Sequence, residues 1–179
     1  MQVLLAFSRF IDAGNEALGR ALRWLVLAAT AISAANALAR YGLSLSSNAW
    51  LEAQWYLFAA IFLLLAGYTL KHNGHVRIDV IYGRLSARSR AWIDIMGSLL
   101  FLMPLCVLMV WLSWAGFAEA LRVDEVSPDA GGLVRWPVRL LIPVGFALLA
   151  LQGVSEIIKR VAFLRGEGVL PHEQSREEL

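Results

Sequence analysis

The stretch from Asn48 to Arg90 constrains the fold of this chain more than any other. It runs apolar from Leu57 to Leu70, long enough with its flanks to cross a bilayer as a helix. Trp55 and Tyr56 precede the apolar run, and a basic loop follows it. Aromatic rings anchor helices at the membrane–water boundary, and basic residues orient them. The stretch therefore predicts one membrane crossing, with an aromatic anchor at its start and a basic loop at its end.

The composition predicts further crossings of the same kind. Hydrophobic residues make up 59% of the 179 and charged residues only 17%, whereas soluble domains are about half apolar and about a quarter charged. The apolar residues gather in long runs, as in membrane spans. We expect an all-α integral membrane protein whose membrane domain covers residues 1–166, followed by a polar tail at 167–179. Its four transmembrane helices are expected at about 22–39, 53–71, 91–117 and 137–160.

The first twenty residues mix apolar side chains with Arg9, Asp12 and Glu16. They predict a short helix lying at the membrane surface ahead of the first span, with a frayed terminus as the alternative. Residues 37–39, Ala-Leu-Ala, resemble a signal-peptide cleavage site, but the polar leader is too long for a typical one. We therefore expect no cleavage there.

Small residues and prolines mark particular points on the helices. Ala31, Ala35 and Ala39 share one helical face, and small residues let another helix approach closely. That face is expected to meet a helix of this chain or of a partner, unless it simply faces lipid. Pro104 should bend the third span near its middle. Pro137 suits the first turn of the fourth helix.

Local spacing predicts three further roles. Ser86 is placed to cap the third helix. Glu156 can pair with Arg160 one turn later. The single cysteine, Cys106, excludes an intrachain disulfide and a cysteine-based metal cluster, and we expect it to pack as a small hydrophobic residue.

Basic residues predict the orientation. If the N-terminus is cytoplasmic, the inner segments hold twelve of the 16 Lys and Arg residues, and the outer segments hold four. Such a bias in short loops predicts that both termini are cytoplasmic. The basic inner loop, 71–90, then contains an interfacial segment between the second and third spans.

The residues expected of an enzyme or a carrier are missing from the sequence. No Gly-rich phosphate loop precedes a lysine, and the net charge of +2 does not suggest a nucleic-acid partner. His72, His75 and His172 all fall in predicted loops, whereas a haem-carrying anchor needs His within its spans. Only Asp79 could join His72 and His75 as a metal ligand, which is too few. We expect no catalytic residue, cofactor or metal site.

The predicted spans also lack the features of a self-sufficient carrier. Such a carrier has internal repeats, broken spans and polar groups near the bilayer midplane, but the middles of these spans are nearly all apolar. The pattern favours a scaffold that fixes a partner in the membrane.

Three motifs resemble the DctQ family, the small membrane subunit of TRAP (tripartite ATP-independent periplasmic) transporters. They are NAWLEAQWYLF at 48–58, GHVRIDV at 74–80, and EVSPDAGGLVRWP at 125–137 followed by LLIPVGFALLALQG. The similarity extends to about Gly166. It implies a bacterial inner-membrane protein with four spans and no substrate or sodium site of its own.

The resemblance also implies partners. In such systems a periplasmic binding protein captures an organic anion, and a large membrane subunit moves it inward with sodium. The small subunit binds the large one, serves as a fixed frame and helps to dock the binding protein. Membrane lipid is the remaining expected partner.

Eight residues are candidates for these partner contacts. Glu52, at the mouth of the second span, could instead serve only its own helix, because the helix dipole favours a carboxylate near the N-terminus. In the basic loop, Arg77 and Asp79 could pair with each other or with the large subunit, unless that loop only sets the membrane topology. The acidic outer loop with its two glycines is the candidate for touching the binding protein. The candidates are Glu52, Gln54, Trp55, His75, Arg77, Asp79, Gly131 and Gly132.

Two other classes of protein fit the sequence less well. A membrane anchor of a quinone-linked respiratory enzyme should show a haem spectrum or a redox partner. An autonomous small carrier or channel should transport a solute as the purified chain alone.

Overall fold

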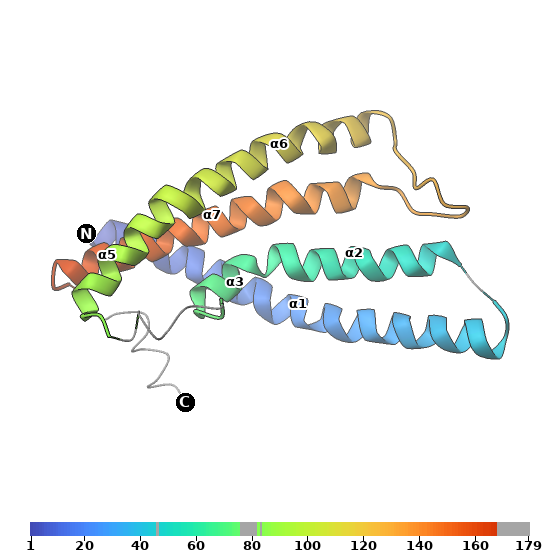
Figure 1. Ribbon diagram of the computed structural model, residues 1–179, viewed down its shortest axis with the longest axis horizontal. Coiled ribbons are helices and arrows are strands. Elements are labelled where there is room, and N and C mark those ends of the chain that lie inside the picture. The colour runs from blue at the N-terminus through green and yellow to red at the C-terminus, as the bar shows by residue number, and fades with distance from the viewer. Residues whose placement is uncertain (46, 76–81, 83, 168–179) are drawn as a thin grey trace.

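Long helices dominate this computed structural model, which describes residues 1–45, 47–75, 82 and 84–167 (Figure 1). In the described residues, the helices are joined by turns and loops, and the one β-type pairing is an isolated antiparallel bridge between Val126 and Val134. The elements are α1 (Gln2–Gly42), α2 (Asn48–Leu64), α3 (Ala66–Lys71), α5 (Ala87–Gly97), the π-helical turn η1 (Ser98–Leu102), α6 (Met103–Arg122) and α7 (Trp136–Leu164).

The described chain holds four helical segments long and apolar enough to cross a membrane. They are Gln2–Gly42, Asn48–Lys71, Ala87–Arg122 and Trp136–Leu164. This confirms an all-α chain with four membrane-spanning helices, and each predicted span falls inside one of these segments. The cytoplasmic placement of both termini stays a prediction.

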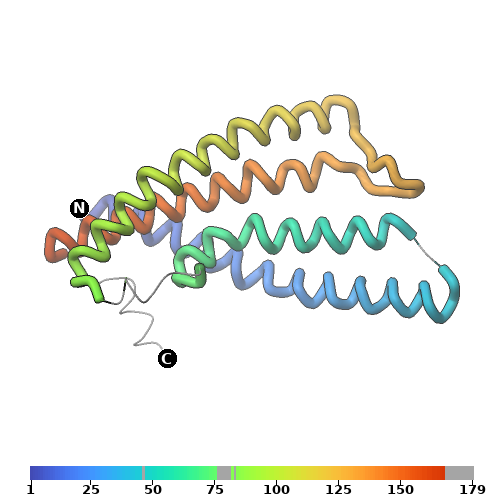
Figure 2. The backbone as a smooth tube through the Cα atoms, viewed as in Figure 1, coloured from blue at the N-terminus to red at the C-terminus, as the bar shows by residue number. Residues whose placement is uncertain are grey.

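The helices form two hairpins that lie side by side, α1 with α2 and α6 with α7 (Figures 1 and 2). Helix α7 is central, because it contacts α1, α2, α3, α5 and α6. The α1–α2 turn and the loop 123–135 lie at one end, called here the loop end. The start of α1, helix α5 and the last turns of α7 lie at the other, called here the terminal end (Figure 1).

The burial pattern is the reverse of that in a water-soluble bundle. The largest fully buried side chains are Gln152, Cys106, Ser8 and Ser155, while bulky aromatic residues such as Phe62 and Phe101 are exposed. Polar groups of membrane helices face the protein interior because lipid cannot hydrogen-bond to them. Cys106 is a buried free cysteine, which confirms its predicted burial.

Two local predictions, the Ser86 cap and the place of Pro137, are confirmed, whereas the bend at Pro104 stays a prediction. The Ser86 Oγ accepts a hydrogen bond from the Ser89 amide at 3.2 Å and caps α5. Pro104 lies directly after the π-helical turn, in which the Met103 amide bonds to the Ser98 carbonyl. Such turns are where long helices bend. Pro137 lies in the first turn of α7.

One expectation about the first helix needs correction, and a second is narrowed to a partner helix or lipid. The predicted short N-terminal helix is not separate, because α1 runs unbroken for 41 residues. No proline interrupts it, and its first half packs against α7; a position at the membrane surface stays a prediction. The face formed by Ala31, Ala35 and Ala39 is not buried by another helix: the first two residues are exposed and Ala39 is only half-buried.

Candidate functional site

Glu52 fastens the outer loop to α2. Its carboxylate is buried and accepts hydrogen bonds from the Ser127 hydroxyl and from the Leu133 amide, the latter at 2.6 Å. Glu52 is the fifth residue of α2, beyond the first turn. The helix dipole therefore stabilises this carboxylate less than its two hydrogen-bond donors do.

Two glycines shape the turn that brings the loop to Glu52. Gly131 has φ of +72°, a left-handed conformation that glycine adopts without steric cost. A Cβ on Gly132 would lie 2.4 Å from the Ser127 Cβ, so only glycine fits there. The structure thus brings together three predicted site residues, Glu52, Gly131 and Gly132. Here they hold the loop, and contact with a binding protein stays a prediction.

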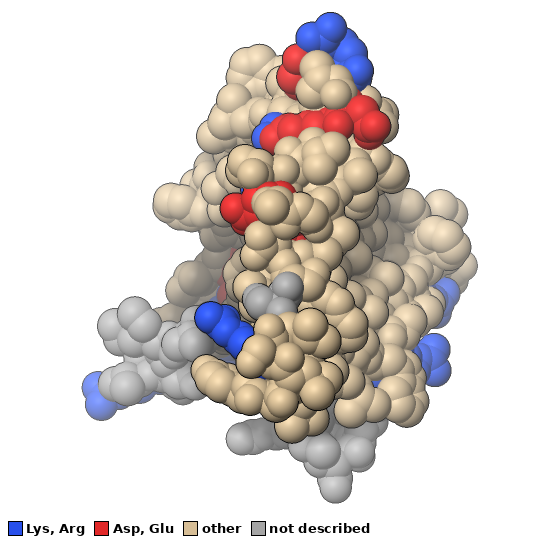
Figure 3. Space-filling model, turned by 90° about the vertical axis from the view of Figure 1, so that its right-hand side faces the viewer, with Lys and Arg blue, Asp and Glu red and all other residues tan. Residues whose placement is uncertain are grey.

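Of the four acidic residues at 119, 124, 125 and 129, two form ion pairs. Glu125 pairs with Arg139 at 2.6 Å, and Glu119 pairs with Arg122 at 2.7 Å. Asp124 and Asp129 are exposed, and the described residues provide no ion pair for either. The end-on view shows acidic side chains gathered over the α6–α7 half of the loop end (Figure 3).

The aromatic pair beside Glu52 belongs to the same end. Trp55 is exposed, and its ring lies edge-on to Tyr56 with centroids 4.4 Å apart. The Tyr56 hydroxyl donates to the Val134 carbonyl at 3.0 Å, which is a second tie between α2 and the loop. Gln54 is half-buried.

The predicted residues of the basic loop lie apart from this end. His75 is exposed beside an apolar hollow of about 170 Å³ that Phe62 and Phe146 help to line. Arg77 and Asp79 fall outside the described residues, so their pairing stays a prediction.

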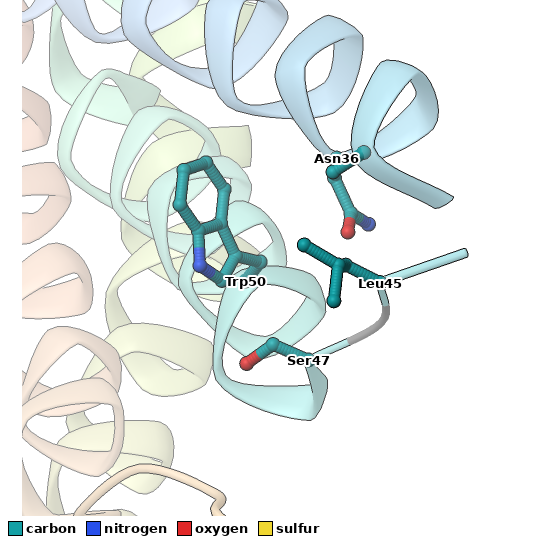
Figure 4. Close-up of a pocket in the computed structure, with 5 residues that line it drawn as sticks. Asn36, Leu45, Ser47 and Trp50 are labelled. Atoms are coloured by element: carbon teal, nitrogen blue, oxygen red, sulfur yellow. The ribbon is translucent and has the colours of Figure 1, made fainter. Parts of the chain in front are cut away.

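A second hollow, of about 190 Å³, opens between the end of α1 and the start of α2 (Figure 4). Asn36, Leu45, Ser47 and Trp50 line it, and its walls are mainly apolar. It contains no ionisable side chain among its lining residues. Across the described chain, no group of three or more His, Cys, Asp or Glu residues could hold a metal ion.

At the terminal end, polar side chains of α1 and α7 form a buried network. The Ser8 and Ser155 hydroxyls are 2.7 Å apart, and the Asn15 Nδ2 donates to the Gln152 Oε1 at 2.7 Å. Asp12 accepts from Ser155 at 2.7 Å. This network holds the first half of α1 against the last half of α7.

Ion pairs extend the same network to α5. Lys159 contacts Asp12 at 3.0 Å and Glu156 at 2.5 Å. Arg160 contacts Glu156 at 2.5 Å and Asp94 at 2.8 Å. This confirms the predicted pair of Glu156 with Arg160. The Tyr82 hydroxyl also donates to Asp94 at 2.6 Å.

The rest of this network was not predicted from the sequence. Its signal was the spacing of polar residues by three or four positions, at 8, 12 and 15 in one helix and at 152, 155 and 156 in another. That spacing places each set on one helical face. Every charged side chain named in this network has an oppositely charged partner within it. The network lines no described cavity, so its role is to hold helices together.

Comparison with known proteins gives one match. The family model for "Tripartite ATP-independent periplasmic transporters, DctQ component" matches residues 29–163, which are 135 of the 179. Neither the curated proteins nor the solved structures contain a significant match to the chain.

Proposed function

The chain belongs to the DctQ component family of the tripartite ATP-independent periplasmic transporters, and we propose that it is the small, non-catalytic subunit of a sodium-coupled importer. In this proposal a periplasmic binding protein delivers an organic anion, a carboxylate, to a large membrane subunit. The chain lies in the bacterial inner membrane with both termini in the cytoplasm. It holds the large subunit still while that subunit moves the anion.

The observation that carries this proposal is the distribution of polar groups. Most of the described buried polar groups at both ends are engaged in hydrogen bonds and ion pairs that join the chain's own helices. The outward faces of the helices are apolar and suited to lipid or to another membrane helix. A subunit built in this way can fix a partner but offers no described polar path for a carboxylate.

The exposed small-residue face of α1 supports a site for the large subunit. Ala31 and Ala35 are exposed and one turn apart, so a partner helix could approach the backbone closely there. The family match favours such a partner over a respiratory enzyme or an autonomous carrier.

Co-purification tests the subunit role and this face together. Tagged chain should retain the large subunit in detergent. Leu at both Ala31 and Ala35 should weaken retention by keeping the helices apart, whereas Ala37→Leu, also exposed but on another side of α1, should not. If the unmodified chain never retains a large subunit, the proposed function fails. If the unmodified chain and the double variant retain the large subunit equally well, the contact lies elsewhere.

Docking of the binding protein is proposed at Asp124 and Asp129, the acidic loop residues with no ion pair in the described chain. Asp124→Asn with Asp129→Asn should raise the binding-protein concentration needed for half-maximal uptake, because complementary charge mainly assists encounter. Replacing the paired Glu119 and Arg122 together by Gln preserves net charge and is the matched control. Uptake kinetics untouched by the Asp changes would remove the loop from the docking surface.

A further inference from the structure

Helix α1 is too long to be explained by one membrane crossing. Its 41 residues extend about 60 Å, roughly twice the hydrocarbon thickness of a bilayer. Trp24 is exposed, and exposed indoles settle at the membrane–water boundary. The part of α1 after Trp24 is by itself long enough to cross the hydrocarbon. Asn15 and Gly19 still pack against Gly67 and Tyr68 near the end of the second span. The turns of α1 before Asn15 therefore occupy some other environment.

This first half of α1 is polar toward the protein and apolar away from it. The inward stripe repeats every three or four residues and consists of Ser8, Ile11, Asn15 and Gly19, all buried. The outward face carries large exposed side chains, with Val3 82% and Phe10 77% exposed and Leu4 and Phe7 also exposed. Water would be an unfavourable surrounding for that outward face.

A basic flank runs beside the apolar face. Arg9, Arg20 and Arg23 are exposed and make no ion pair within the described chain. On an ideal helix, Arg9 and Arg20 differ in direction by only about 20°, and Arg23 lies about 40° from Arg9 on the other side, so all three fall within about 60°. The Arg23 guanidinium lies 5.8 Å from the centre of the Trp24 ring.

The acid on this flank is already neutralised. Glu16 is contacted by Lys71 at 2.6 Å and by His72 at 2.9 Å. It therefore does not compete for the three arginines, and the flank keeps its positive charge along several turns of helix.

We propose that the first half of α1 binds anionic phospholipid. Its apolar face enters the acyl-chain boundary, and the arginines of its basic flank contact the lipid phosphate groups. Apolar burial combined with basic charge is what anionic membrane surfaces select. The family match begins only at residue 29, so the shared family region does not account for this segment. The proposal goes beyond the scaffold role and does not depend on it.

The depth of this segment can be measured in the full chain. Cys106→Ala removes the one native thiol, and Phe10→Cys then accepts an environment-sensitive fluorophore. In nanodiscs of mixed phosphatidylcholine and phosphatidylglycerol, lipid-borne spin labels should quench the fluorophore. The large subunit, once added, should not abolish that quenching. Failure of lipid-borne labels to quench, or protection by the large subunit, would overturn the proposal.

Lipid preference tests the basic flank. The detergent-purified chain, exposed to equal phosphatidylglycerol and phosphatidylcholine, should retain the anionic lipid preferentially. Each change of Arg9, Arg20 or Arg23 to Gln should lower that preference by up to about fivefold. Arg40→Gln, at the other end of α1, is the matched control and should change nothing. Equal preference in the triple variant and the unmodified chain would overturn the proposal, while unchanged retention of the large subunit would leave the proposed function intact.

Discussion

Arg160→Met tests whether the terminal-end network stabilises the bundle. Arg160 is 5% exposed and Glu156 is 2% exposed, and Arg160 also contacts Asp94 of α5. Methionine has a similar length but no charge, so it removes the cation that the carboxylates of Glu156 and Asp94 share.

The expected cost follows from the partners that remain. Removing one member of a buried ion pair costs about 3–5 kcal/mol because the other charge stays buried. Glu156 keeps Lys159 at 2.5 Å, which places the expected loss near the lower bound, about 3 kcal/mol. Adding Glu156→Gln removes one of the stranded charges. The double variant should therefore lose less than the sum of the single changes, with a coupling of about 1–3 kcal/mol.

The measurement is the free energy of unfolding in mixed micelles of a mild detergent and dodecyl sulfate, followed by loss of helical circular dichroism. Arg122→Met is the matched control, because Arg122 and its partner Glu119 are both exposed at the loop end; its stability should not change measurably. Unchanged stability of Arg160→Met, or strictly additive losses in the double variant, would refute a stabilising role for the network.

Two further predictions concern close packing and the outer loop. Gly145→Ala should destabilise the bundle by about 1–3 kcal/mol, because its Cβ would lie 2.7 Å from a backbone oxygen of α2. In the control Gly14→Ala, the added Cβ meets nothing within 4 Å, so the bundle should not be destabilised. Equal stabilities of the two variants in the same detergent titration would contradict the close packing at Gly145. Glu52→Ala should speed hydrogen exchange at the Leu133 amide, because that amide loses its acceptor. Gln54→Ala is the control and should leave the Leu133 amide protected. Unchanged exchange in both variants would show that the loop is held by other contacts.

The sequence predicted the parts of this structure that depend on near neighbours. Long apolar runs predict four helices because lipid leaves a spanning chain little other choice. The cap at Ser86 and the pair of Glu156 with Arg160 lie within one helical turn, where spacing alone determines proximity.

The parts that could not be predicted join residues far apart in the chain. Asp12 meets Ser155, and Glu52 meets Leu133, only after the hairpins have packed. Mixed polarity in residues 1–20 fits either a surface helix or a packed one, since spacing shows that Asp12 and Asn15 share a face but not what that face touches. The polar network therefore emerged only from the helix packing.

Reconstituted uptake tests the central claim most directly. Vesicles containing this chain, the large subunit and the binding protein should accumulate a carboxylate in response to an inward sodium gradient. Vesicles with the chain alone should accumulate none, and those lacking only the chain should lose most of the uptake. Sodium-driven transport by the chain alone would contradict the account, as would full uptake without it.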